Sequence, residues 1–490
     1  MMIPELSGCE PVALEEMLDA REARVRRQQQ LLKQWQGSLI CLTLNIAGPY
    51  KAFPLALQTF REAVSQITEL LQEKKTPVVH FEQQLNKTGP TAFFSVQEDA
   101  RKVKQWMTRL EEGCPFGRIF DIDVLKSDGS KISRVEVGFA ERKCLICDQA
   151  AAVCARSRAH TVDKLTVHTI SVMKRYFGET VCDRIAACAV RALLYEVAVT
   201  PKPGLIDRSN NGSHQDMDFY LFLDSTAALL PYFRESARLG FRFAGTPSEL
   251  FSKLRVLGVD AERAMHAATN GVNTHKGAIF LLGILVAAGG RLLREGQQMS
   301  EEKMFSLSAQ IAACALDDFK TITAQSAKTA GERLFIQYGL TGVRGEAAGG
   351  FPSVKDFALP VLKKTLADGY SKDEAGTAAL LSLMANVSDS TLIHRSSLSV
   401  QHKFSQVIGR LLQRRQTVQE QTAAAWQLDT FMRQQNLSAG GCADLLACAW
   451  LTLFLEDIWK IPAGSTTAYT VFRSALGSAS ISIMKSHKPE

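Results

Sequence analysis

Apolar and polar positions follow two different periods along the chain, and the change between them divides it into two parts. Up to about residue 140, segments with helical spacing alternate with short runs of β-branched and aromatic residues, which favour strands. We expect helices at 12–36, 54–74 and about 98–112, and strands at 38–46, 76–80, 92–96 and 118–125. A polar turn at 127–130 predicts that a further strand, 131–139, forms a hairpin with the strand before it. The first part is therefore predicted to be an α+β domain.

Beyond about residue 159 the strand pattern nearly disappears, and helical periods ended by Gly, Pro or Asn take over. Helices are expected at 161–176, 179–198, 277–294, 302–328, 373–386, 401–435 and 442–459. The second part is therefore predicted to be all-α. No Gly/Ser-rich or Pro-rich linker marks the junction, and we place it inside the first of these helices, giving domains 1–172 and 173–490.

Length and composition agree with this division. At 490 residues the chain is too long for one ordinary core, since domains average roughly 150 residues. The net charge of +7 comes from 57 basic and 50 acidic residues and is not gathered into a run, so a nucleic-acid partner is not indicated. The apolar stretch 277–290 falls short of the ~20 residues that span a bilayer, so we expect a buried helix and no membrane partner.

The cysteines and the first residues point to an intracellular location. Eleven cysteines are scattered over the chain, and the first residues carry carboxylates where a signal peptide needs positive charge. Reduced thiols and a cytoplasmic protein are therefore expected.

The first candidate site is a pair of carboxylates. Within residues 118–125 the alternation of a strand sends Asp121 and Asp123 to the same face. Two such carboxylates together with substrate phosphates suit Mg²⁺, which assists phosphoryl and nucleotidyl transfer. An Asp-x-Asp motif alone also fits a solvated strand face before a turn. Only the surrounding sequence can distinguish a metal site from such a surface.

Those neighbours carry a resemblance. REARVRRQQQLL (21–32), NIAGPYK (45–51), GRIFDIDVL (117–125) and RKCLICDQAAAVCARSRAH (142–160) follow one another, and together they resemble the holo-citrate-lyase synthase family of apo-citrate lyase phosphoribosyl-dephospho-CoA transferases. The resemblance implies a nucleotidyltransferase-like domain that attaches phosphoribosyl-dephospho-CoA to a serine of the apo citrate lyase acyl carrier protein and releases pyrophosphate. It makes Asp121 and Asp123 catalytic metal ligands. As contacts to the triphosphate we assign Lys51, Arg118 and Arg134.

A group of cysteine and histidine residues follows the carboxylates. Cys144 and Cys147 form a Cys-x-x-Cys motif, with Cys154 and His160 downstream. These residue types are the usual ligands of a tetrahedral zinc ion. Their spacing matches no standard finger, however, and a reduced, partly buried turn is the reading that the spacing favours.

The second candidate site is a dense polar loop between 200 and 218. Two prolines and Gly204 favour a fixed conformation, and a helix is expected to begin after Ser213 or His214, with Asp216 in its first turn. The loop also contains Lys202, Asp207, Arg208 and Asp218. A capped surface helix would explain the same pattern.

Three further segments combine polar residues with glycines or with a helix start. His275 and Lys276 begin an apolar helix, where amide groups and a lysine can hold phosphate. Glycines surround Arg344 and Glu346, and two more, Gly440 and Gly441, precede Asp444 on a helix. Glycine lets a backbone approach a ligand closely, although each segment alone also fits a helix cap.

Together these segments resemble a second family. EVAVTPKPGLIDRSNNGSHQDMD (196–218), NTHKGAIF (273–280), GVRGEAAGGFP (342–352) and NLSAGGCADLLA (436–447) are similar to the triphosphoribosyl-dephospho-CoA synthases. The resemblance implies that a hydroxyl of dephospho-CoA displaces adenine from the ribose of ATP. Such a glycosyl transfer needs carboxylates for the developing charge and the proton, and Mg²⁺ with basic groups for the triphosphate.

The implied roles follow from these needs. Glu196, Glu346 and Asp444 are the candidates for the base, and the sequence does not rank them. Asp216 and Asp218 are the expected metal ligands, with Asp216 also a candidate catalytic group. The expected substrate contacts are Lys202, Asp207, His214, His275, Lys276, Arg344, Gly440 and Gly441.

The sequence therefore predicts a bifunctional enzyme that makes the prosthetic group of citrate lyase and then attaches it. Two alternatives stay open. The same chemistry could serve the carrier of malonate decarboxylase, or one site could have decayed into a carrier-binding or CoA-binding module. The second alternative arises at 382–397, where Asp389, His394 and Arg395 fit the synthase pattern but Thr391 stands near an expected Asn and Ser396 and Ser397 replace glycines.

Overall fold

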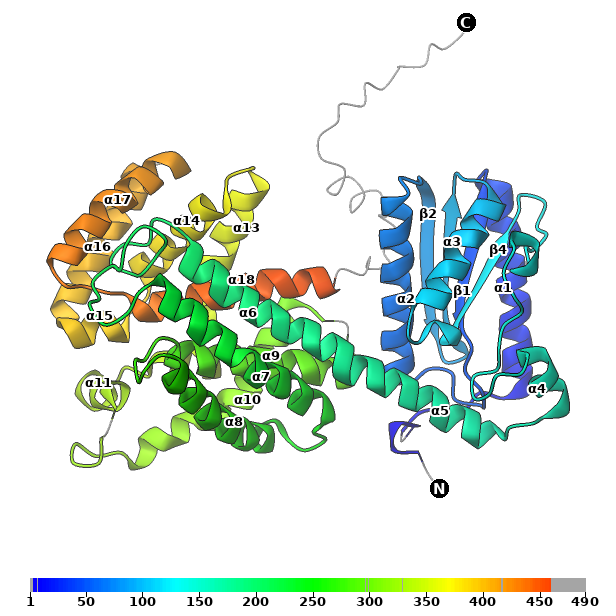
Figure 1. The fold of residues 1–490 in the computed structure, drawn as a ribbon, viewed down its shortest axis with the longest axis horizontal. Coiled ribbons are helices and arrows are strands. Elements are labelled where there is room, and N and C mark those ends of the chain that lie inside the picture. Colours follow the sequence, from blue (N-terminus) through cyan, green and yellow to red (C-terminus); the bar gives the residue numbers. More distant parts are fainter. Residues whose placement is uncertain are drawn as a thin grey trace, which may run out of the picture. The chain divides into compact units, whose positions relative to one another are not determined.

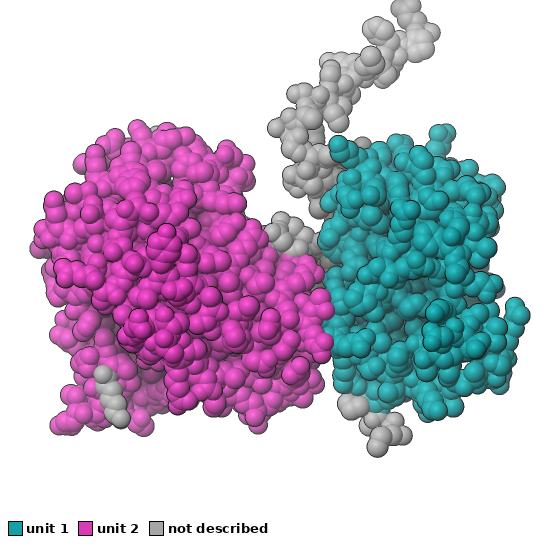
Figure 2. All heavy atoms as spheres, in the orientation of Figure 1, with its two compact units in different colours: residues 1–176, 460–490 teal, residues 177–459 magenta. Residues whose placement is uncertain are grey.

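The computed structural model describes residues 3–6, 8–295, 297, 299–327, 329–415 and 417–459. The chain divides into two compact units, which part between Tyr176 and Phe177 and are coloured separately in Figure 2. Unit 1 is the part up to Tyr176, and unit 2 comprises Phe177–Trp459. Unit 1 contains a small antiparallel sheet with helices, and the described part of unit 2 contains helices and no strand. The prediction that a part with mixed strands and helices is followed by a helical part is confirmed.

Unit 1 is built on a four-stranded antiparallel sheet with the strand order β2-β3-β1-β4 (Figure 1). The strands are β1 (Ser38–Leu44), β2 (Val78–Asn86), β3 (Gly89–Val96) and β4 (Phe120–Leu125). The helices are α1 (Leu14–Gln34), α2 (Pro54–Glu73), α3 (Ala100–Gly113), α4 (Ala151–Ser157) and α5 (Val162–Arg175). Short 3₁₀ turns lie at Pro4–Leu6, Gly117–Ile119 and Val135–Val137.

The sheet has two buried faces, which explains why β1 is apolar along most of its length. On one face Leu31 of α1 packs with Leu39 and Cys41 of β1. The alternate residues of the sheet, Ile40 and Ile122 among them, are buried on the opposite face, which α2 and α3 cover (Figure 1). The carboxylates of β4 therefore lie on the face of the sheet that carries α1.

One predicted element of unit 1 is wrong. Residues 131–139 do not form a strand, because pairing with β4 stops after an isolated bridge between Leu125 and Lys131 and a bond from Ile132 N to Val124 O. Ser133 and Glu136 then bond reciprocally, each side chain accepting from the other's backbone N–H. These two side chains bind backbone N–H groups locally, so the segment forms a 3₁₀ turn and not a strand paired with β4.

Unit 2 begins within a π-helical turn, Tyr176–Val181, and continues with α6 (Cys182–Ala198), α7 (Phe219–Arg242), α8 (Pro247–Ala268) and α9 (Lys276–Arg294). Next come α10 (Glu301–Ala312), a 3₁₀ segment (Ala313–Thr321), α11 (Ala330–Tyr338), α12 (Gly342–Ala348) and a π turn (Val354–Ala358). The rest are α13 (Leu359–Ala367), α14 (Lys372–Asn386), α15 (Ser390–Arg395), α16 (Leu398–Arg414), α17 (Val418–Gln434) and α18 (Gly440–Trp459).

Two of the predicted helices are broken in the structure. The segment 302–328 leaves the α-helical path at Ala313 and continues as a 3₁₀ segment to Thr321. The segment 401–435 is two helices, because Thr417 and Glu420 form a capping box that starts α17. Both errors come from a continuous helical period that does not show where the backbone changes direction.

The core of unit 2 is organised around α9. This helix is apolar and long enough to cross a membrane by composition alone, but 78% of its apolar window is buried inside the unit. The predicted buried helix is therefore confirmed. It packs against α7 at very close range: a Cβ on Gly290 would lie 2.1 Å from the carbonyl oxygen of Ala237, and one on Gly240 would lie 2.1 Å from that of Ala287.

Candidate active sites

The two carboxylates of β4 share a face, as strand alternation predicts. Asp121 lies opposite Thr43 and Asp123 opposite Cys41 in the register with β1. The Thr43 hydroxyl donates to Asp121 Oδ2 at 3.2 Å, and Lys131 Nζ lies 2.6 Å from Asp123 Oδ2. Their side chains are 48% and 36% exposed, so a substrate can reach both carboxylates.

This pair has the donor chemistry that Mg²⁺ requires. Both side chains offer hard carboxylate oxygens on one rigid strand, and Mg²⁺ is usually held by one or two carboxylates together with substrate phosphates. Each carboxylate now faces a cation, Lys131 or Arg142. The residues therefore fit a magnesium ion that arrives with a triphosphate, because the phosphates can take over the two cationic partners.

Arg142 is a site residue that sequence reasoning did not single out. Its Nη1 donates to Asp121 Oδ1 at 3.2 Å, and its Nη2 pairs with the buried carboxylate of Glu111 on α3. Burial raises the pKa of Glu111, and the Arg142 charge opposes that shift. Arg142 is the first residue of the motif at 142–160. Its place in that motif was the sequence signal that could have identified it as a partner of Asp121.

The three predicted triphosphate contacts of unit 1 do not converge. Arg118 lines a cavity of about 890 Å³ together with Asn45 and Arg158. Lys51 instead donates to the carbonyl of Ile46, and burial, helped by the charge of Arg21, lowers its pKa. The third residue, Arg134, also has a partner outside this cavity.

Arg134 pairs with Glu112 near the end of α3. Neither Lys51 nor Arg134 lines the cavity that contains Arg118. Of the three cations, Arg118 alone has the position of a ligand contact in this cavity.

The cysteine and histidine residues of unit 1 are brought together in space. The sulfur atoms of Cys144, Cys147 and Cys154 and one ring nitrogen of His160 all lie within 4.8 Å of one another. The chain spacing matches no standard finger, but Cys154 on α4 and His160 just after that helix are close to Cys144 and Cys147.

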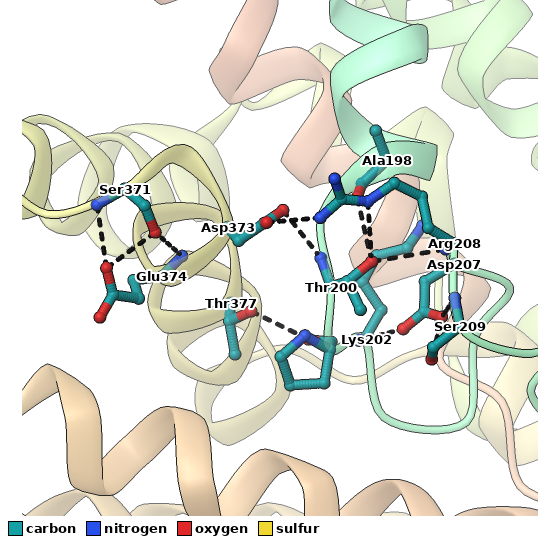
Figure 3. Close-up of polar contacts among 11 residues, drawn as sticks. Ala198, Thr200, Lys202, Asp207, Arg208, Ser209, Ser371, Asp373, Glu374 and Thr377 are labelled. Atoms are coloured by element: carbon teal, nitrogen blue, oxygen red, sulfur yellow. Dashed lines mark hydrogen bonds and ion pairs between the residues drawn. The ribbon is translucent and has the colours of Figure 1, made fainter.

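In unit 2 the polar loop that follows α6 is fixed to α14 (Figure 3). Asp373 of α14 accepts from Thr200 N at 3.2 Å and pairs with Arg208. Nearby, the Thr377 hydroxyl donates to the carbonyl of Pro201 at 2.9 Å. The loop is thus attached to a helix that follows it by more than 160 residues in the sequence.

Asp207 stabilises the loop from within. One of its oxygens accepts from Lys202 N at 3.0 Å, and the other from the Ser209 hydroxyl at 2.6 Å (Figure 3). Gly204 has a φ of +68°, and a Cβ there would lie 2.5 Å from the carbonyl oxygen of Leu437, so the turn has no room for a side chain. Asp207 does not line the cavity described next, and its contacts are those of a loop-forming residue.

A cavity of about 190 Å³ lies where this loop meets α9 and α18. The predicted site residues that line it are Glu196, Lys202, His214, His275, Lys276, Gly440 and Asp444. Residues that sequence reasoning missed line it as well, namely Asn273, Thr274, Thr391 and Ser438. Segments far apart in the sequence therefore form one polar site.

A carboxylate and a lysine are buried in this site, and a second carboxylate, that of Asp444, is half-buried. Lys202 and Glu196 form an ion pair with both side chains almost fully buried, and burial raises the pKa of Glu196 while Lys202 opposes the shift. Burial also raises the pKa of Asp444 well above its usual range, and the charges of Glu196 and Asp389 add to the effect. Asp444 receives a hydrogen bond from the Ala278 amide near the start of α9.

His275 lines the cavity and has one buried ring nitrogen without a partner among the described residues. Its Nδ1 lies 2.7 Å from the Ser225 hydroxyl, which itself accepts from the Thr274 hydroxyl. When the Ser225 hydroxyl donates to Nδ1, the ring proton is on Nε2, which has no partner among the described residues. Burial, with the Lys202 charge, lowers the pKa of His275 to about 3, so the ring is a neutral donor.

His214 is also held in one neutral tautomer. Arg395 donates to Nδ1 at 3.1 Å, so the proton is on Nε2, which lies 3.1 Å from the Ser438 hydroxyl. Burial and the Arg395 charge lower the pKa of His214. The His-Arg pair at 394–395 thus reaches the site through its arginine.

Two helix N-termini open on the same cavity. Lys276 and Gly277 begin α9, Gly440 begins α18, and all three line the cavity. The free amides and the dipole of each terminus attract anions. This site can therefore combine phosphate binding with the acid and base groups described above.

Two of the predicted metal ligands have other positions. α7 begins at Phe219, later than expected, and Asp218 is its N-cap, accepting from Leu221 N at 2.8 Å. Asp216 therefore precedes the helix, with a side chain that is 64% exposed. The expectation that Asp216 lies in the first helical turn is wrong, because Asp218 takes the capping position. Neither residue lines the cavity.

The remaining predicted residues lie outside the cavity lining. Glu346 accepts from both the amide and the hydroxyl of Ser353, at 2.8 Å each, and burial raises its pKa. Arg344 lies 3.3 Å from Asp318 and lines a separate cavity with residues of α8 and α9. Gly441 packs against Asp389, at 3.0 Å from the position that a Cβ would take.

The segment 382–397 forms regular caps despite its departure from the expected pattern. Asp389 caps α15 through the Thr391 and Leu392 amides and accepts from Cys442 N at 2.7 Å, which joins α15 to α18. Ser397 caps α16 through the amide of Val400. Ser397, which stands where a glycine was expected, therefore serves as the N-cap of α16.

Comparison with known proteins agrees with this division of the chain. Residues 182–462 match the family model described as CitG: ATP:dephospho-CoA triphosphoribosyl transferase, and residues 12–176 match CitX: Apo-citrate lyase phosphoribosyl-dephospho-CoA transferase. The Protein CitXG of Haemophilus influenzae is 36% identical over 90% of this chain and 96% of its own length. The chain belongs to the fused CitXG family.

Further relatives cover either the whole chain or its second part. The Protein CitXG of Leuconostoc mesenteroides subsp. cremoris is 35% identical over 92% of this chain and 98% of its own length. A probable 2-(5''-triphosphoribosyl)-3'-dephosphocoenzyme-A synthase of Vibrio cholerae is 41% identical over 56% of this chain and 88% of its own length. Both matched families are transferases, so the prediction of a fused, bifunctional transferase is confirmed.

Proposed function

We propose that the chain makes and then attaches the prosthetic group of citrate lyase in the cytoplasm. Residues 173–490 synthesise triphosphoribosyl-dephospho-CoA from ATP and dephospho-CoA, and residues 1–172 transfer phosphoribosyl-dephospho-CoA to a serine of the apo citrate lyase acyl carrier protein. The observation that carries the proposal is the convergence of Glu196, Lys202, His275 and Asp444 on one cavity beside two helix N-termini. A glycosyl transfer from a nucleoside triphosphate needs this combination of base, neutral donor and anion-binding groups.

In the synthase reaction a hydroxyl of dephospho-CoA forms a bond to the anomeric carbon of ATP, and the bond from that carbon to adenine breaks. The hydroxyl gives up its proton, and adenine takes up a proton as it leaves. We assign Asp444 as the base because it lines the cavity; its raised pKa favours the protonated form, so it must ionise before it can accept the proton of the hydroxyl. Glu196 is less suited to this role because Lys202 already pairs with it.

His275 is suited to the leaving adenine. Its Nε2 has no partner among the described residues, its ring is neutral, and Nε2 is a donor in the tautomer in which the Ser225 hydroxyl donates to Nδ1. Such a group can hydrogen-bond a ring nitrogen of adenine as negative charge develops there, without first losing a proton to solvent. Glu346 has the contacts of a structural residue and is not assigned as the base.

Lys276 and the amides of α9 and α18 are suited to the triphosphate, since all of them line the cavity. His214 and the backbone at Gly440 complete the substrate contacts in this proposal. Mg²⁺ would neutralise charge on the phosphates. Asp216 and Asp218, which the sequence suggested as its ligands, stand outside the cavity, so the triphosphate oxygens are the principal donors that we expect.

In the transfer reaction the carrier serine attacks the phosphorus next to the ribose, and pyrophosphate leaves. Asp121 and Asp123 would hold Mg²⁺, which stabilises charge on the phosphoryl oxygens. Arg142 and Lys131, which now face the two carboxylates, are positioned to contact the phosphates of the donor. Arg118 adds a further cation from the neighbouring cavity.

Mass spectrometry of carrier protein tests the whole proposal. The chain is incubated with ATP, Mg²⁺, dephospho-CoA and either apo citrate lyase carrier or the apo carrier of malonate decarboxylase, and adenine release is followed in parallel. We expect adenine release and an adduct on the citrate lyase carrier. An adduct confined to the malonate decarboxylase carrier would move the proposal to that enzyme. Binding of both substrates without adenine release would contradict the synthase assignment.

A further inference from the structure

Four potential metal ligands meet in unit 1 although no function has been assigned to them. Cys147 Sγ lies 3.4 Å from Cys154 Sγ and 3.3 Å from His160 Nε2. With Cys144 Sγ, all four ligand atoms lie within 4.8 Å of one another. Three thiols and an imidazole therefore face one common point.

These separations are close to those of a tetrahedral zinc site. With bonds of ~2.3 Å to sulfur and ~2.0 Å to nitrogen, the edges of a zinc tetrahedron measure roughly 3.5–3.8 Å. The two separations around Cys147, 3.4 Å and 3.3 Å, are slightly shorter than such an edge, and small outward movements of the side chains would accommodate the ion. A structural disulfide does not explain the arrangement, because it would join two thiols and leave the third thiol and the imidazole without a role.

The backbone around the first two ligands is organised to hold them. Cys144 N donates to Gln149 O at 2.7 Å and Ala151 N donates to Arg142 O at 2.8 Å, which closes a tight loop. Inside that loop the Ile146 amide lies 3.5 Å from Cys144 Sγ. An amide directed at a cysteine sulfur stabilises a thiolate, the form that binds metal.

The other two ligands come from a separate element that the ion would join to the loop. Cys154 lies on α4 and is 8% exposed, and His160 follows the end of that helix. All four positions are filled by protein side chains, so no coordination site remains open for a substrate. Such closed sites stabilise structure, whereas catalytic zinc sites keep a position for water or substrate.

We propose that Cys144, Cys147, Cys154 and His160 bind one structural Zn²⁺, which fixes the 142–160 segment against the transferase site. The consequence for the site follows from two contacts. Arg142, two residues before Cys144, reaches Asp121, and the carbonyl of Lys143 accepts from Arg118. The ion would thus help to fix two cations of the transferase site, and three of its ligands, Cys144, Cys154 and His160, line the same cavity as Arg118.

The test begins with the metal content of the purified full-length chain. Elemental analysis should find one zinc per chain, and the chain loaded with Co²⁺ in its place should show the intense visible absorption of a tetrahedral cobalt-thiolate site. Cys147→Ser and His160→Asn should each lose the zinc, while Cys9→Ser, which alters a half-buried thiol of the same unit outside the cluster, should retain it. Circular dichroism establishes that each variant is folded.

A measurement on the unaltered chain keeps the test decisive if the variants do not fold. An organomercurial reagent that titrates thiols should release the zinc in step with modification of three cysteines, and a chelator in excess should lower the melting temperature of unit 1. Adenine release by unit 2 should be unchanged by the chelation, once Mg²⁺ is restored. A chain that contains no zinc and takes up neither Zn²⁺ nor Co²⁺, or one whose zinc survives Cys147→Ser and His160→Asn, would overturn the proposal.

Discussion

Arg142 Nη1 donates to Asp121 Oδ1 at 3.2 Å, while the other end of the same guanidinium pairs with the buried Glu111. One cation therefore joins the exposed carboxylate of β4 to the core beneath α3. This relationship gives Asp121 a fixed orientation before any substrate binds. It also means that a phosphate which replaces Asp121 as the partner of Arg142 leaves the carboxylate free for a metal ion.

The carboxylate pair should be essential for transfer but not for synthesis. Asp121→Asn and Asp123→Asn each remove a metal-binding charge, and we expect attachment to the carrier to fall by roughly 10²-fold or more. Adenine release should stay unchanged, because its site is formed by residues of unit 2. Mass spectrometry of the carrier and a chromatographic assay of adenine measure the two steps separately.

Asp19→Asn is a suitable control for this pair, since Asp19 is an exposed carboxylate on α1 of the same unit. It should leave both activities intact. A folded Asp121→Asn or Asp123→Asn chain that no longer releases adenine would show that the two activities are not divided as proposed.

Asp444 should be the base of the synthase reaction. Asp444→Asn keeps the size of the side chain but removes its basicity, so the kcat for adenine release should fall by about 10²–10⁴-fold. The KM for ATP should change far less, because phosphate contacts come from other groups. Steady-state kinetics with dephospho-CoA as the acceptor would show the split.

Glu346→Gln is the matched variant for this comparison. Glu346 is also a half-buried carboxyl with a raised pKa, but it bonds to Ser353 and does not line the cavity. We expect reduced stability with kcat largely retained. The assignment fails if Glu346→Gln loses kcat in a folded chain while Asp444→Asn keeps it.

The buried pair of Glu196 and Lys202 should be asymmetric in its effect on stability. Lys202→Met leaves a buried carboxylate without its partner and should lower the free energy of unfolding by about 3–5 kcal/mol. The double variant Glu196→Gln, Lys202→Met should recover part of that loss because no buried charge remains. Urea unfolding followed by circular dichroism measures both, and equal losses for single and double variants would contradict a charge-based explanation.

The buried His275 should make unit 2 sensitive to acid. Its pKa is lowered to about 3 from 6.5, so the unfolded chain binds a proton over a range where the folded chain does not. Stability should therefore fall as the pH falls from 6.5 towards 3, with a contribution from His275 on the order of a few kcal/mol. Urea unfolding across this range measures the slope.

His275→Gln should flatten that slope, whereas His402→Gln, at an exposed position on α16, should not. The buried carboxyls contribute with the opposite sign, because the raised pKa values of Glu196 and Asp444 make stability fall as the pH rises above their unfolded values. Comparing each variant with the unaltered chain cancels that contribution. An unchanged slope in His275→Gln would mean that another group causes the acid sensitivity.

Much of the fold followed from local patterns. The strands at 38–46 and 118–125 were predicted because their apolar residues sit at strand spacing, and α9 because of its helical period and an apolar run too short for a membrane. The strand expected at 131–139 was wrong because two side chains, Ser133 and Glu136, offered the backbone a local alternative. Such competition depends on a few hydrogen bonds and leaves the hydrophobic pattern unchanged.

The candidate sites were predicted to a different extent. Asp121 and Asp123 share a face for a reason internal to one strand, so their relationship was accessible from spacing alone. Asp216 and Asp218 were misplaced because one residue decides where a helix begins. Among Glu196, Glu346 and Asp444, no local feature separates the two that line the cavity from the one that does not.

The sequence by itself determined the two-part organisation, the helical or mixed character of each part, the family and the set of chemically capable residues, because these depend on periodicity, composition and motifs. Tertiary structure decided which of those residues meet. Asp444 meets the start of α9, Arg142 meets Asp121, and His160 meets three cysteines only through the packing of elements that are distant in the chain. Burial then set the charge of His275 and Asp444, since desolvation is a property of the surroundings and not of the residue.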